Sequence, residues 1–407
     1  MININAERLW QSLMTMAEIG ATPKGGCNRQ ALTDLDKQGR DLLIQWATEL
    51  GCSHRYDQMG NLFIHYPTKN DELAPVLIGS HLDTQPTGGK FDGVYGVLAG
   101  LEVLRTIHEN DITLSRPIEV VAWTNEEGAR FSPAMIGSGV WCGEFSLDYG
   151  WSRKDKDDLS IKEELLRLGM LGTEDCRAFP VKAALELHIE QGPILEKEQL
   201  QIGIVKGVQG IRWYDLTLQG QPVHAGPTPM EQRRDPVKGI SEICLKLYEM
   251  AEKYSPWARV TFGDMTVSPG ARNTVPETVI LAVDLRHPDE SILTKMDAEF
   301  KTIVARTSAS LSLTPDIREE WHSPAVNFDE SCISAVSDAV AVHGYRAKEM
   351  FSGAGHDSVY VSRVAPTGMI FIPCDEGISH NELENAQYDD IEAGCNVLLS
   401  SAISLSI

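Results

Sequence analysis

Residues 76–84 read VLIGSHLDT, a short apolar run that ends in a cluster of polar residues. The glycine-rich stretch GGKFDG follows at residues 88–93, and residues 94–108 have the apolar spacing of a helix. A buried strand, a polar loop and a helix in this order are typical of an α/β sheet with crossover helices. Because such sheets often hold ligands at the carboxyl ends of their strands, His81, Asp83 and Asp92 are candidates for a metal site.

Similar segments occur on both sides of this stretch. We expect helices at residues 6–19, 34–50, 331–343 and from 389 onward, and strands at 61–66, 118–123, 183–189 and 369–373. The segments after residue 328 show helical and strand patterns like those of the first 200 residues. They predict one α/β domain that is discontinuous in the sequence.

A different pattern begins near Gly210. Residues 213–219 alternate as in a half-exposed antiparallel strand. The elements expected next are a helix at 236–253, strands at 259–267 and 278–285, a helix at 290–308 and a strand near 311–319. This βαββαβ order is the ferredoxin-like plan. We therefore predict a catalytic metal-binding domain made of residues 1–210 and 328–407, with an inserted domain at 211–327.

Three further segments place acidic residues and histidines at or near strands of the first domain. Residues 124–128 read TNEEG, residues 186–192 read ELHIEQG, and residues 377–380 read GISH. Together the segments supply the candidate ligands His81, Asp92, Glu127, His188 and His380. Two carboxylates and several imidazoles around one shared aspartate suit a pair of zinc-like ions about 3.5–4 Å apart.

Two acidic residues remain for other roles. Asp83 is two residues from His81, so its carboxylate is expected to accept the second N–H of that imidazole and fix its tautomer. Glu126 is free to take a proton from the attacking water and to deliver it to a leaving nitrogen. This predicts that Glu126 is needed for turnover but not for metal binding.

Composition narrows the class of partner. The chain has 58 acidic and 36 basic residues and a net charge of −22, which disfavours nucleic acid and anionic membranes. No run of about 20 apolar residues and no basic region followed by an apolar core is present, so we expect neither membrane spanning nor secretion. Eight scattered cysteines without a Cys-x-x-Cys pair favour reduced thiols and a cytoplasmic location.

These residues resemble those of the N-carbamoyl-L-amino-acid amidohydrolases, β-ureidopropionases and allantoate amidohydrolases, a group within the dinuclear-metal aminoacylase and carboxypeptidase superfamily. The resemblance covers nearly the whole chain, and it is carried by GSHLDT (79–84), FDG (91–93), TNEEGARF (124–131), ELHIEQG (186–192), HAG (224–226), RRD (233–235), SGAGHD (352–357) and GISH (377–380). It implies that His81, Asp92 and His188 hold one metal, that Asp92, Glu127 and His380 hold the other, and that Glu126 is the base. Zinc is the favoured ion, and manganese, cobalt and nickel are alternatives.

The resemblance also implies a set of substrate-binding residues: Gln191, His224, Asn273, Arg286, Gly355 and His356. Arg286 can bind a carboxylate through a bidentate fork, and His224 can stabilise an oxyanion. In this family the histidine and asparagine that correspond to His224 and Asn273 reach the active site of the neighbouring subunit. This implies a homodimer paired through the inserted domain, which would also act as a lid.

The activity expected from these features is removal of the carbamoyl group from an N-carbamoyl-L-amino acid or from N-carbamoyl-β-alanine. Allantoate hydrolysis is the first alternative, and an aminoacylase or dipeptidase activity is the second. Peptidase relatives usually carry an aspartate where this chain has His188, which favours the carbamoyl-cleaving branch. A metal-stabilised binding protein without turnover is the alternative from another class, and the presence of Glu126 argues against it.

Overall fold

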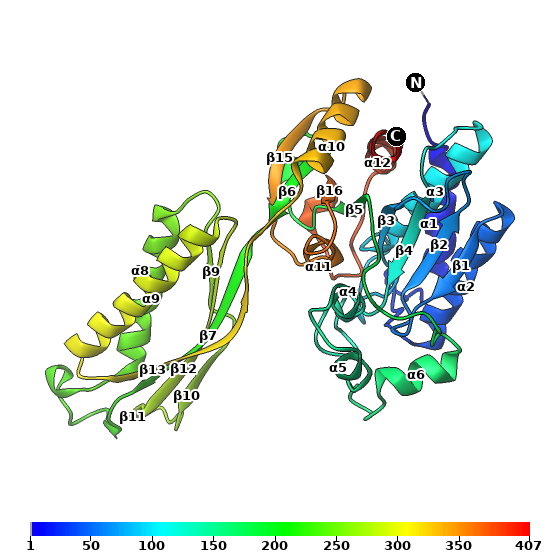
Figure 1. Cartoon of the computed structure of the whole chain (residues 1–407). Helices are drawn as coiled ribbons and strands as arrows, with labels where there is room; N and C mark the ends of the chain where they lie inside the picture. Colours follow the sequence, from blue (N-terminus) through cyan, green and yellow to red (C-terminus); the bar gives the residue numbers. More distant parts are fainter. Residues whose placement is uncertain (1) are drawn as a thin grey trace. The chain divides into compact units, whose positions relative to one another are not determined.

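A computed structural model describes residues 2–407, and these form two compact units (Figure 1). One unit combines the chain up to Gly207 with Asn327–Ile407, and the other is Val208–Val326. The α/β segments before and after the insertion therefore form one unit, although some 120 residues separate them in the sequence.

The first unit contains a mixed sheet. In spatial order its strands are β1 (Ser53–Tyr56), β2 (Leu62–Tyr66), β4 (Ile118–Trp123), β3 (Val76–His81), β5 (Ala183–Ile189), β16 (Thr367–Ile372) and β6 (Ile202–Val208), and both β14 (Val326–Asn327) and β15 (Ala347–Ser352) lie beside β6. The four central strands, β4, β3, β5 and β16, are parallel. Every residue of these four strands is buried, as expected for a parallel sheet that is covered on both faces.

Helices and turns cover this sheet. They are α1 (Ala6–Glu18), α2 (Asp34–Glu49), α3 (Val94–Glu109), α4 (Ile136–Cys142), α5 (Leu147–Trp151), α6 (Ile161–Leu168), α7 (Ile194–Lys197), α10 (Glu330–His343), α11 (Asp357–Val361), α12 (Tyr388–Ser406) and the 3-10 turn η2 (Asp375–Gly377). Gly100 of α3 packs against Ile78 and Val120. Leu77 and Val121 point to the opposite face, into a cluster with α4 and α6.

The second unit has a five-stranded antiparallel sheet with two helices on one face (Figure 1). Its elements in chain order are β7 (Gly210–Gln219), β8 (Val223–His224), η1 (Met230–Gln232), α8 (Pro236–Lys253), β9 (Arg259–Thr261), β10 (Met265–Ser268), β11 (Thr274–Val275), β12 (Thr278–His287), α9 (Glu290–Ser310) and β13 (Thr314–Ser323). The spatial order is β10-β12-β7-β13, with β9 beside β12, and β8 and β11 form a separate pair.

Alternation along β7 explains how this sheet packs. Tyr214, Leu216 and Leu218 are buried with residues of α8 and α9, whereas Trp213 on the same strand is exposed. Asp235 caps the start of α8, with Pro236 as the first helical residue, and Asp289 caps the start of α9. The sheet therefore has a helix-covered face and an open face.

The strand predicted at residues 259–267 is two strands. Thr261 of β9 pairs with Asp284, and Met265 of β10 pairs with Leu281. Met265 follows Thr261 by four residues, whereas their partners Asp284 and Leu281 on β12 are only three residues apart. The segment therefore contains one extra residue, which interrupts the pairing as in a β-bulge. Alternation alone does not reveal such a bulge, which explains why the prediction of one continuous strand was wrong.

Candidate metal centre

Strand ends position most of the predicted ligands at one edge of the first unit's sheet. His81 is the last residue of β3, and His188 is the penultimate residue of β5. Glu127 lies four residues beyond β4, and Asp92 lies two residues before α3. His380 comes from the segment between η2 and α12. The carboxyl ends of parallel strands meet at one edge, so these segments converge although they are far apart in the sequence.

The candidate ligands form two groups of three residues, and within each group the ligand atoms lie within 4.8 Å of one another. One group is His81, Asp92 and His188, and the other is Asp92, Glu127 and His380. In the first group, Nε2 of His188 is 3.1 Å and Nε2 of His81 is 3.6 Å from Oδ1 of Asp92. In the second group, Nε2 of His380 is 3.5 Å from Oδ2 of Asp92 and 3.3 Å from Oε2 of Glu127. The two oxygens of the Asp92 carboxylate therefore face different histidines.

Backbone carbonyls orient the two buried histidines. Nδ1 of His81 lies 2.9 Å from the backbone oxygen of Asp83, and Nδ1 of His188 lies 2.9 Å from that of Ile189. A carbonyl oxygen can only accept a hydrogen bond, so each Nδ1 carries the proton. When the ring is neutral, Nε2 keeps the lone pair that faces Asp92 and can bind a metal.

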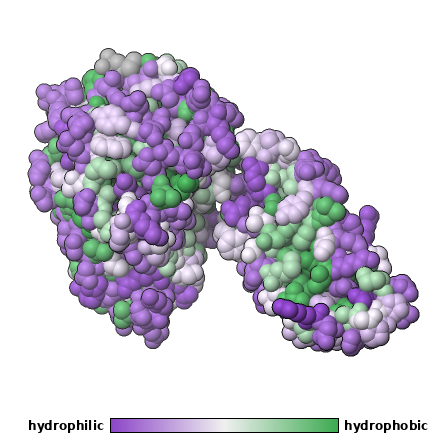
Figure 2. Space-filling model, turned by 180° about the vertical axis from the view of Figure 1, so that it is seen from behind, coloured by the Kyte–Doolittle hydropathy of each residue, from purple (hydrophilic) through white to green (hydrophobic). Residues whose placement is uncertain are grey.

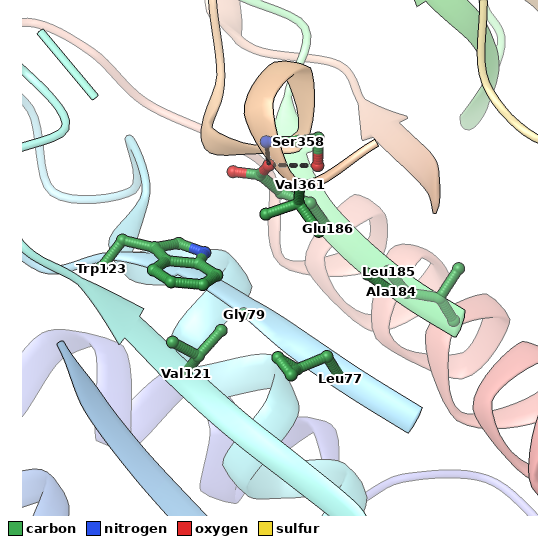
Figure 3. Close-up of a pocket in the computed structure, with 9 residues that line it drawn as sticks. All are labelled: Leu77, Gly79, Val121, Trp123, Ala184, Leu185, Glu186, Ser358 and Val361. Atoms are coloured by element: carbon green, nitrogen blue, oxygen red, sulfur yellow. Dashed lines mark hydrogen bonds between the residues drawn. The ribbon is translucent and has the colours of Figure 1, made fainter. Parts of the chain in front are cut away.

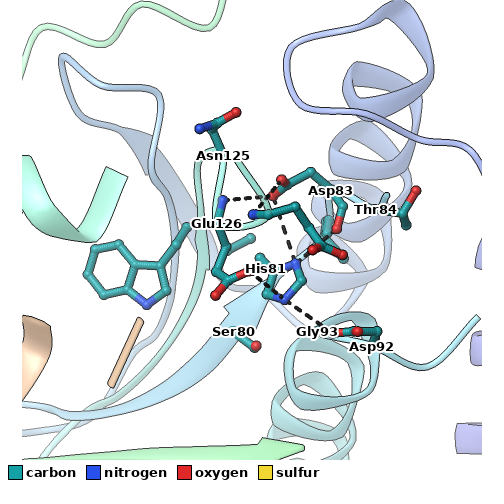
Figure 4. A network of polar contacts seen from close by, with 12 residues as sticks. Ser80, His81, Asp83, Thr84, Asp92, Gly93, Asn125 and Glu126 are labelled. Atoms are coloured by element: carbon teal, nitrogen blue, oxygen red, sulfur yellow. Dashed lines mark hydrogen bonds and ion pairs between the residues drawn. The ribbon is translucent and has the colours of Figure 1, made fainter. Parts of the chain in front are cut away.

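The position of Asp83 corrects one sequence-based expectation. The hydrogen bond to His81 comes from the backbone oxygen of Asp83, while its carboxylate oxygen Oδ1 lies 3.9 Å from the ring nitrogen. The carboxylate instead accepts hydrogen bonds from the backbone N–H groups of Glu126, at 3.3 Å, and Glu127, at 3.2 Å. The turn after β3 directs the carbonyl toward the imidazole and the side chain toward the loop that follows β4. Asp83 thus links the two loops (Figure 4).

Glu126 and Glu127 are adjacent in sequence but face different histidines. Oε2 of Glu126 lies 3.4 Å from Nε2 of His81 (Figure 4). Oε2 of Glu127 instead lies 3.3 Å from Nε2 of His380. Asn125, which has a φ of 57°, donates hydrogen bonds to two backbone oxygens farther along the same loop. The two neighbouring carboxylates therefore point toward different histidines, as expected for successive residues of the chain.

Negative charge is crowded in this region. Burial raises the pKa of Glu127 well above its usual value, and the charge of Asp92 adds to the effect. Burial and the charge of Asp357 do the same to the pKa of Glu126. Burial also opposes ionisation of Asp92, but the hydrogen bond and charge of His188 hold its pKa below the usual value. Cations between these carboxylates would relieve their repulsion, and the imidazole and carboxylate donors fit divalent metals.

Three residues that sequence reasoning missed contact the ligands. Gln85 donates a hydrogen bond to Oε2 of Glu127 at 2.7 Å, and Ser379 donates one to Oδ2 of Asp92 at 2.7 Å. Glu384 accepts hydrogen bonds from the backbone N–H groups of the turn that carries Asp92. No local pattern distinguishes these residues from ordinary polar loop residues, because their partners are distant in the sequence.

The expected substrate residues of the first unit lie close to the ligands. Gln191 donates through Nε2 to Oδ2 of Asp92 at 2.9 Å. The ring of His356 lies 4.7 Å from that of His188, centroid to centroid, and its Nε2 is 2.9 Å from Oγ of Ser352. Gly355 precedes His356 at the start of α11. The structure thus brings this group of residues to the same edge of the sheet.

The other expected substrate residues belong to the second unit. His224 of β8 pairs with Thr274 of β11, and the backbone oxygen of Asn273 accepts a hydrogen bond from Ala225, which brings His224 and Asn273 to the same small hairpin. Arg286, near the end of β12, donates from Nε and Nη2 to the carboxylate of Asp284.

Glu186 is a further buried carboxylate at this edge. Glu186 of β5 accepts hydrogen bonds from Oγ of Ser80 at 2.7 Å and from the backbone N–H of Ser358 at 3.1 Å. Figure 3 shows Glu186 and Ser358 beside a cavity of about 10 Å³ that is lined mainly by apolar side chains. The cavity is too small for a substrate. Through its hydrogen bonds, Glu186 links β3 and β5 to the start of α11.

Comparisons with known proteins agree with this arrangement. The model of peptidase family M20/M25/M40 matches residues 77–404. The chain is 44% identical over 400 residues to an N-carbamoyl-L-amino-acid amidohydrolase of Rhizobium meliloti, covering 98% of this chain and 96% of the relative. It is 31% identical over 388 residues to an allantoate amidohydrolase of Bacillus subtilis, covering 94% and 93%. The crystal structure of a hydantoinase/carbamoylase family amidase from Burkholderia multivorans superposes with a TM-score of 0.97 at 51% identity, covering 100% and 98%.

The fold and the clustered ligands thus define a hydrolase of the metal-dependent class. The chain belongs to peptidase family M20/M25/M40, and its relatives include named amidohydrolases. Among residues 2–407, no helix has the length and apolar character needed to cross a membrane.

Proposed function

We propose that this protein is a two-metal amidohydrolase that removes the carbamoyl group of an N-carbamoyl-L-amino acid or of N-carbamoyl-β-alanine. The products would be the free amino acid, ammonia and carbon dioxide. The observation that carries the proposal is the position of Asp92, whose carboxylate is shared by two groups of potential ligands. The similarity over nearly the full length to an N-carbamoyl-L-amino-acid amidohydrolase supports the choice of substrate.

The five side chains named from the sequence would hold the metals. His81 and His188 would join Asp92 at one ion, and Glu127 and His380 would join it at the other. Zinc is the favoured ion, with manganese, cobalt and nickel as alternatives that suit the same donors. When bound, the ions would polarise the ureido carbonyl and lower the pKa of the attacking water.

Glu126 would transfer the proton. Its carboxylate is not shared with either ligand group, and it lies beside His81 at the same edge. Oε2 would take a proton from the water and return it to the leaving nitrogen. Asp83 would act indirectly, because it holds the backbone of both Glu126 and Glu127.

Substrate binding would involve both units. Gln191, Gly355 and His356 would contact the substrate from the first unit. Arg286 would bind its carboxylate, with the guanidinium held in place by Asp284. His224 would stabilise the oxyanion and Asn273 would donate from its amide.

The second unit would be a ferredoxin-like lid that also pairs two copies of the chain. Its helix α8 and its edge strand β10 expose large apolar side chains, among them Leu245 (62% exposed), Tyr248 (52%) and Met265 (48%). Apolar residues are visible over this unit in Figure 2. An exposed apolar surface beside an unpaired strand edge supports contact with a second copy. The eight free cysteines support a reducing, cytoplasmic location.

A substrate panel tests the proposal. Ammonia release is measured with N-carbamoyl-L-methionine, N-carbamoyl-β-alanine and allantoate, using protein reconstituted with Zn²⁺ or Mn²⁺. We expect release from at least one of the two N-carbamoyl amino acids. Release from allantoate alone would favour the alternative that the Bacillus subtilis relative represents. Hydrolysis of N-acetyl amino acids alone would indicate an aminoacylase, and inactivity on every substrate would indicate a binding protein.

A further inference from the structure

Glu384 is a buried carboxylate that the proposed chemistry does not use. Only 2% of the residue is exposed, and it belongs to neither group of ligand atoms. Its Oε1 accepts hydrogen bonds from the backbone N–H of Phe91, at 2.9 Å, and of Asp92, at 3.0 Å. One carboxylate oxygen therefore holds two consecutive peptide groups of the turn that carries the shared ligand.

The other oxygen of Glu384 faces a different segment. Oε2 lies 3.3 Å from Oγ of Ser379, and that hydroxyl is 2.7 Å from Oδ2 of Asp92. Ser379 directly precedes His380 in the sequence. Glu384 thus connects the Asp92 turn with the segment of His380, although almost 300 residues separate the two.

A glycine leaves the space for this side chain. A Cβ at Gly89 would lie 2.0 Å from Cδ of Glu384 and 2.1 Å from its Oε1, closer than side-chain atoms can approach. Gly89 also belongs to the glycine-rich stretch that leads to Asp92. The absence of a side chain at residue 89 is therefore required for the Glu384 carboxylate to reach the turn.

We infer that Glu384 is a positioning residue that prepares the group formed by Asp92, Glu127 and His380 for its metal ion. The inference rests on the proposed two-metal function. Removal of the carboxylate would leave two buried N–H groups without a partner and would release the Asp92 turn. Residues that orient metal ligands in this way typically contribute about 10- to 100-fold to metal affinity.

Cobalt titration of the metal-free protein tests the inference. Co²⁺ binding is followed by visible absorption in the presence of a competing chelator, and thermal unfolding of each metal-free variant is recorded in parallel. The wild-type protein is expected to bind two ions. For Glu384→Ala we expect the affinity for at least one of them to fall about 10- to 100-fold. Glu384→Gln should recover most of this loss, because its amide oxygen can still accept both N–H groups.

Glu382→Gln is the matched control on the same segment. Glu382 faces Lys24 at 3.5 Å, and the lysine side chain is 79% exposed, so this ion pair contributes little. The control should bind both ions as the wild-type protein does. A purely structural role for Glu384 would lower the unfolding temperature of the metal-free protein and leave both cobalt affinities unchanged, and this result would overturn the inference.

A second variant decides the matter if Glu384→Ala does not fold. Ser379→Ala removes only the hydroxyl between Glu384 and Asp92, and we expect it to weaken one cobalt site by up to about tenfold in a folded protein. Unchanged cobalt affinities in folded Ser379→Ala would overturn the inference. If the wild-type protein itself binds no second ion, the proposed function fails together with this inference, whereas a normal wild-type titration with unaffected variants rejects the inference alone.

Discussion

Gly93 lies directly against the imidazole ring of His81: a Cβ at Gly93 would be 2.3 Å from both Cε1 and Nε2 of the ring. Nε2 is the atom that faces Asp92. The residue between the shared ligand and helix α3 must therefore be a glycine, both for this contact and for its φ of 68°.

Gly93→Ala is predicted to displace His81 and to weaken metal binding and activity by at least about tenfold. Gly169→Ala is the control, because Gly169 has a φ of 65° and open space around its Cβ position. Both residues have a positive φ, so the control accounts for that feature, although ψ is −49° at Gly93 and 29° at Gly169. Only the first variant places a Cβ against a ligand. Metal content and ammonia release are compared for the two. Equal behaviour of the two variants would show that strain, and not the contact with His81, causes the loss.

Glu126→Gln is predicted to lower kcat by about 100- to 10,000-fold while both metals stay bound. In the proposed mechanism Glu126 transfers the proton, and it does not belong to either ligand group. Glu127→Gln should instead reduce the metal content toward one ion per chain. Steady-state kinetics and elemental analysis separate these results. Loss of a metal from Glu126→Gln would mean that Glu126 is a ligand.

Metal removal is predicted to abolish activity and to lower the unfolding temperature. The buried carboxylates repel one another without cations, and a ligand that binds only the folded state stabilises it by about 2.7 kcal/mol at 100 times its Kd. Calorimetry and ammonia release are measured before chelation, after it and after return of Zn²⁺. Full activity of the chelated protein would contradict the proposed role of the metals.

A pair outside the centre gives a prediction for stability against pH. The hydrogen bond with Glu119 raises the pKa of His65. Burial opposes ionisation of Glu119, but hydrogen bonds from His65 and Arg55 lower its pKa overall. The contribution of His65 is complete below its unfolded pKa of about 6.5 and is lost as the pH rises through the raised folded value. The contribution of Glu119 is present above about pH 4.3 and is lost as the pH falls through the lowered folded value.

His65→Gln should therefore destabilise the protein more at pH 5.5 than at pH 8.5, by roughly 0.5–1 kcal/mol for a partly exposed pair. Urea unfolding at the two pH values measures the difference. His54→Gln, on the neighbouring strand β1, replaces an exposed histidine and is the control. The same change with pH in both variants would show that the His65–Glu119 contact is not its source.

Apolar runs and helical periodicity predicted several elements of both units correctly. The strands at residues 118–123 and 183–189 and the helix at 236–253 have the predicted bounds, because burial of a whole strand or of one helix face leaves a clear local pattern. The proximity of the five candidate side chains was also predicted, from the positions of their segments at or near strands of one sheet. Helix α7 was missed because its four residues carry little signal, and strand β15 was missed because its sequence AKEMFS contains no continuous apolar run.

Other features depend on contacts that no local pattern reveals. Whether the carbonyl or the carboxylate of Asp83 accepts the hydrogen bond from His81 depends on the conformation of the turn after β3. Glu384 lies in a polar segment and meets its partners almost 300 residues away. Such residues hold the ligands rather than bind the metal, so their chemistry alone does not distinguish them from ordinary polar residues.

Anomalous diffraction from crystals grown with Zn²⁺ tests the central claim most directly. We expect two peaks about 3.5–4 Å apart with the Asp92 carboxylate between them. One peak should contact His81 and His188, and the other should contact Glu127 and His380. A single peak at full zinc occupancy, or peaks that do not share Asp92, would contradict the two-metal account.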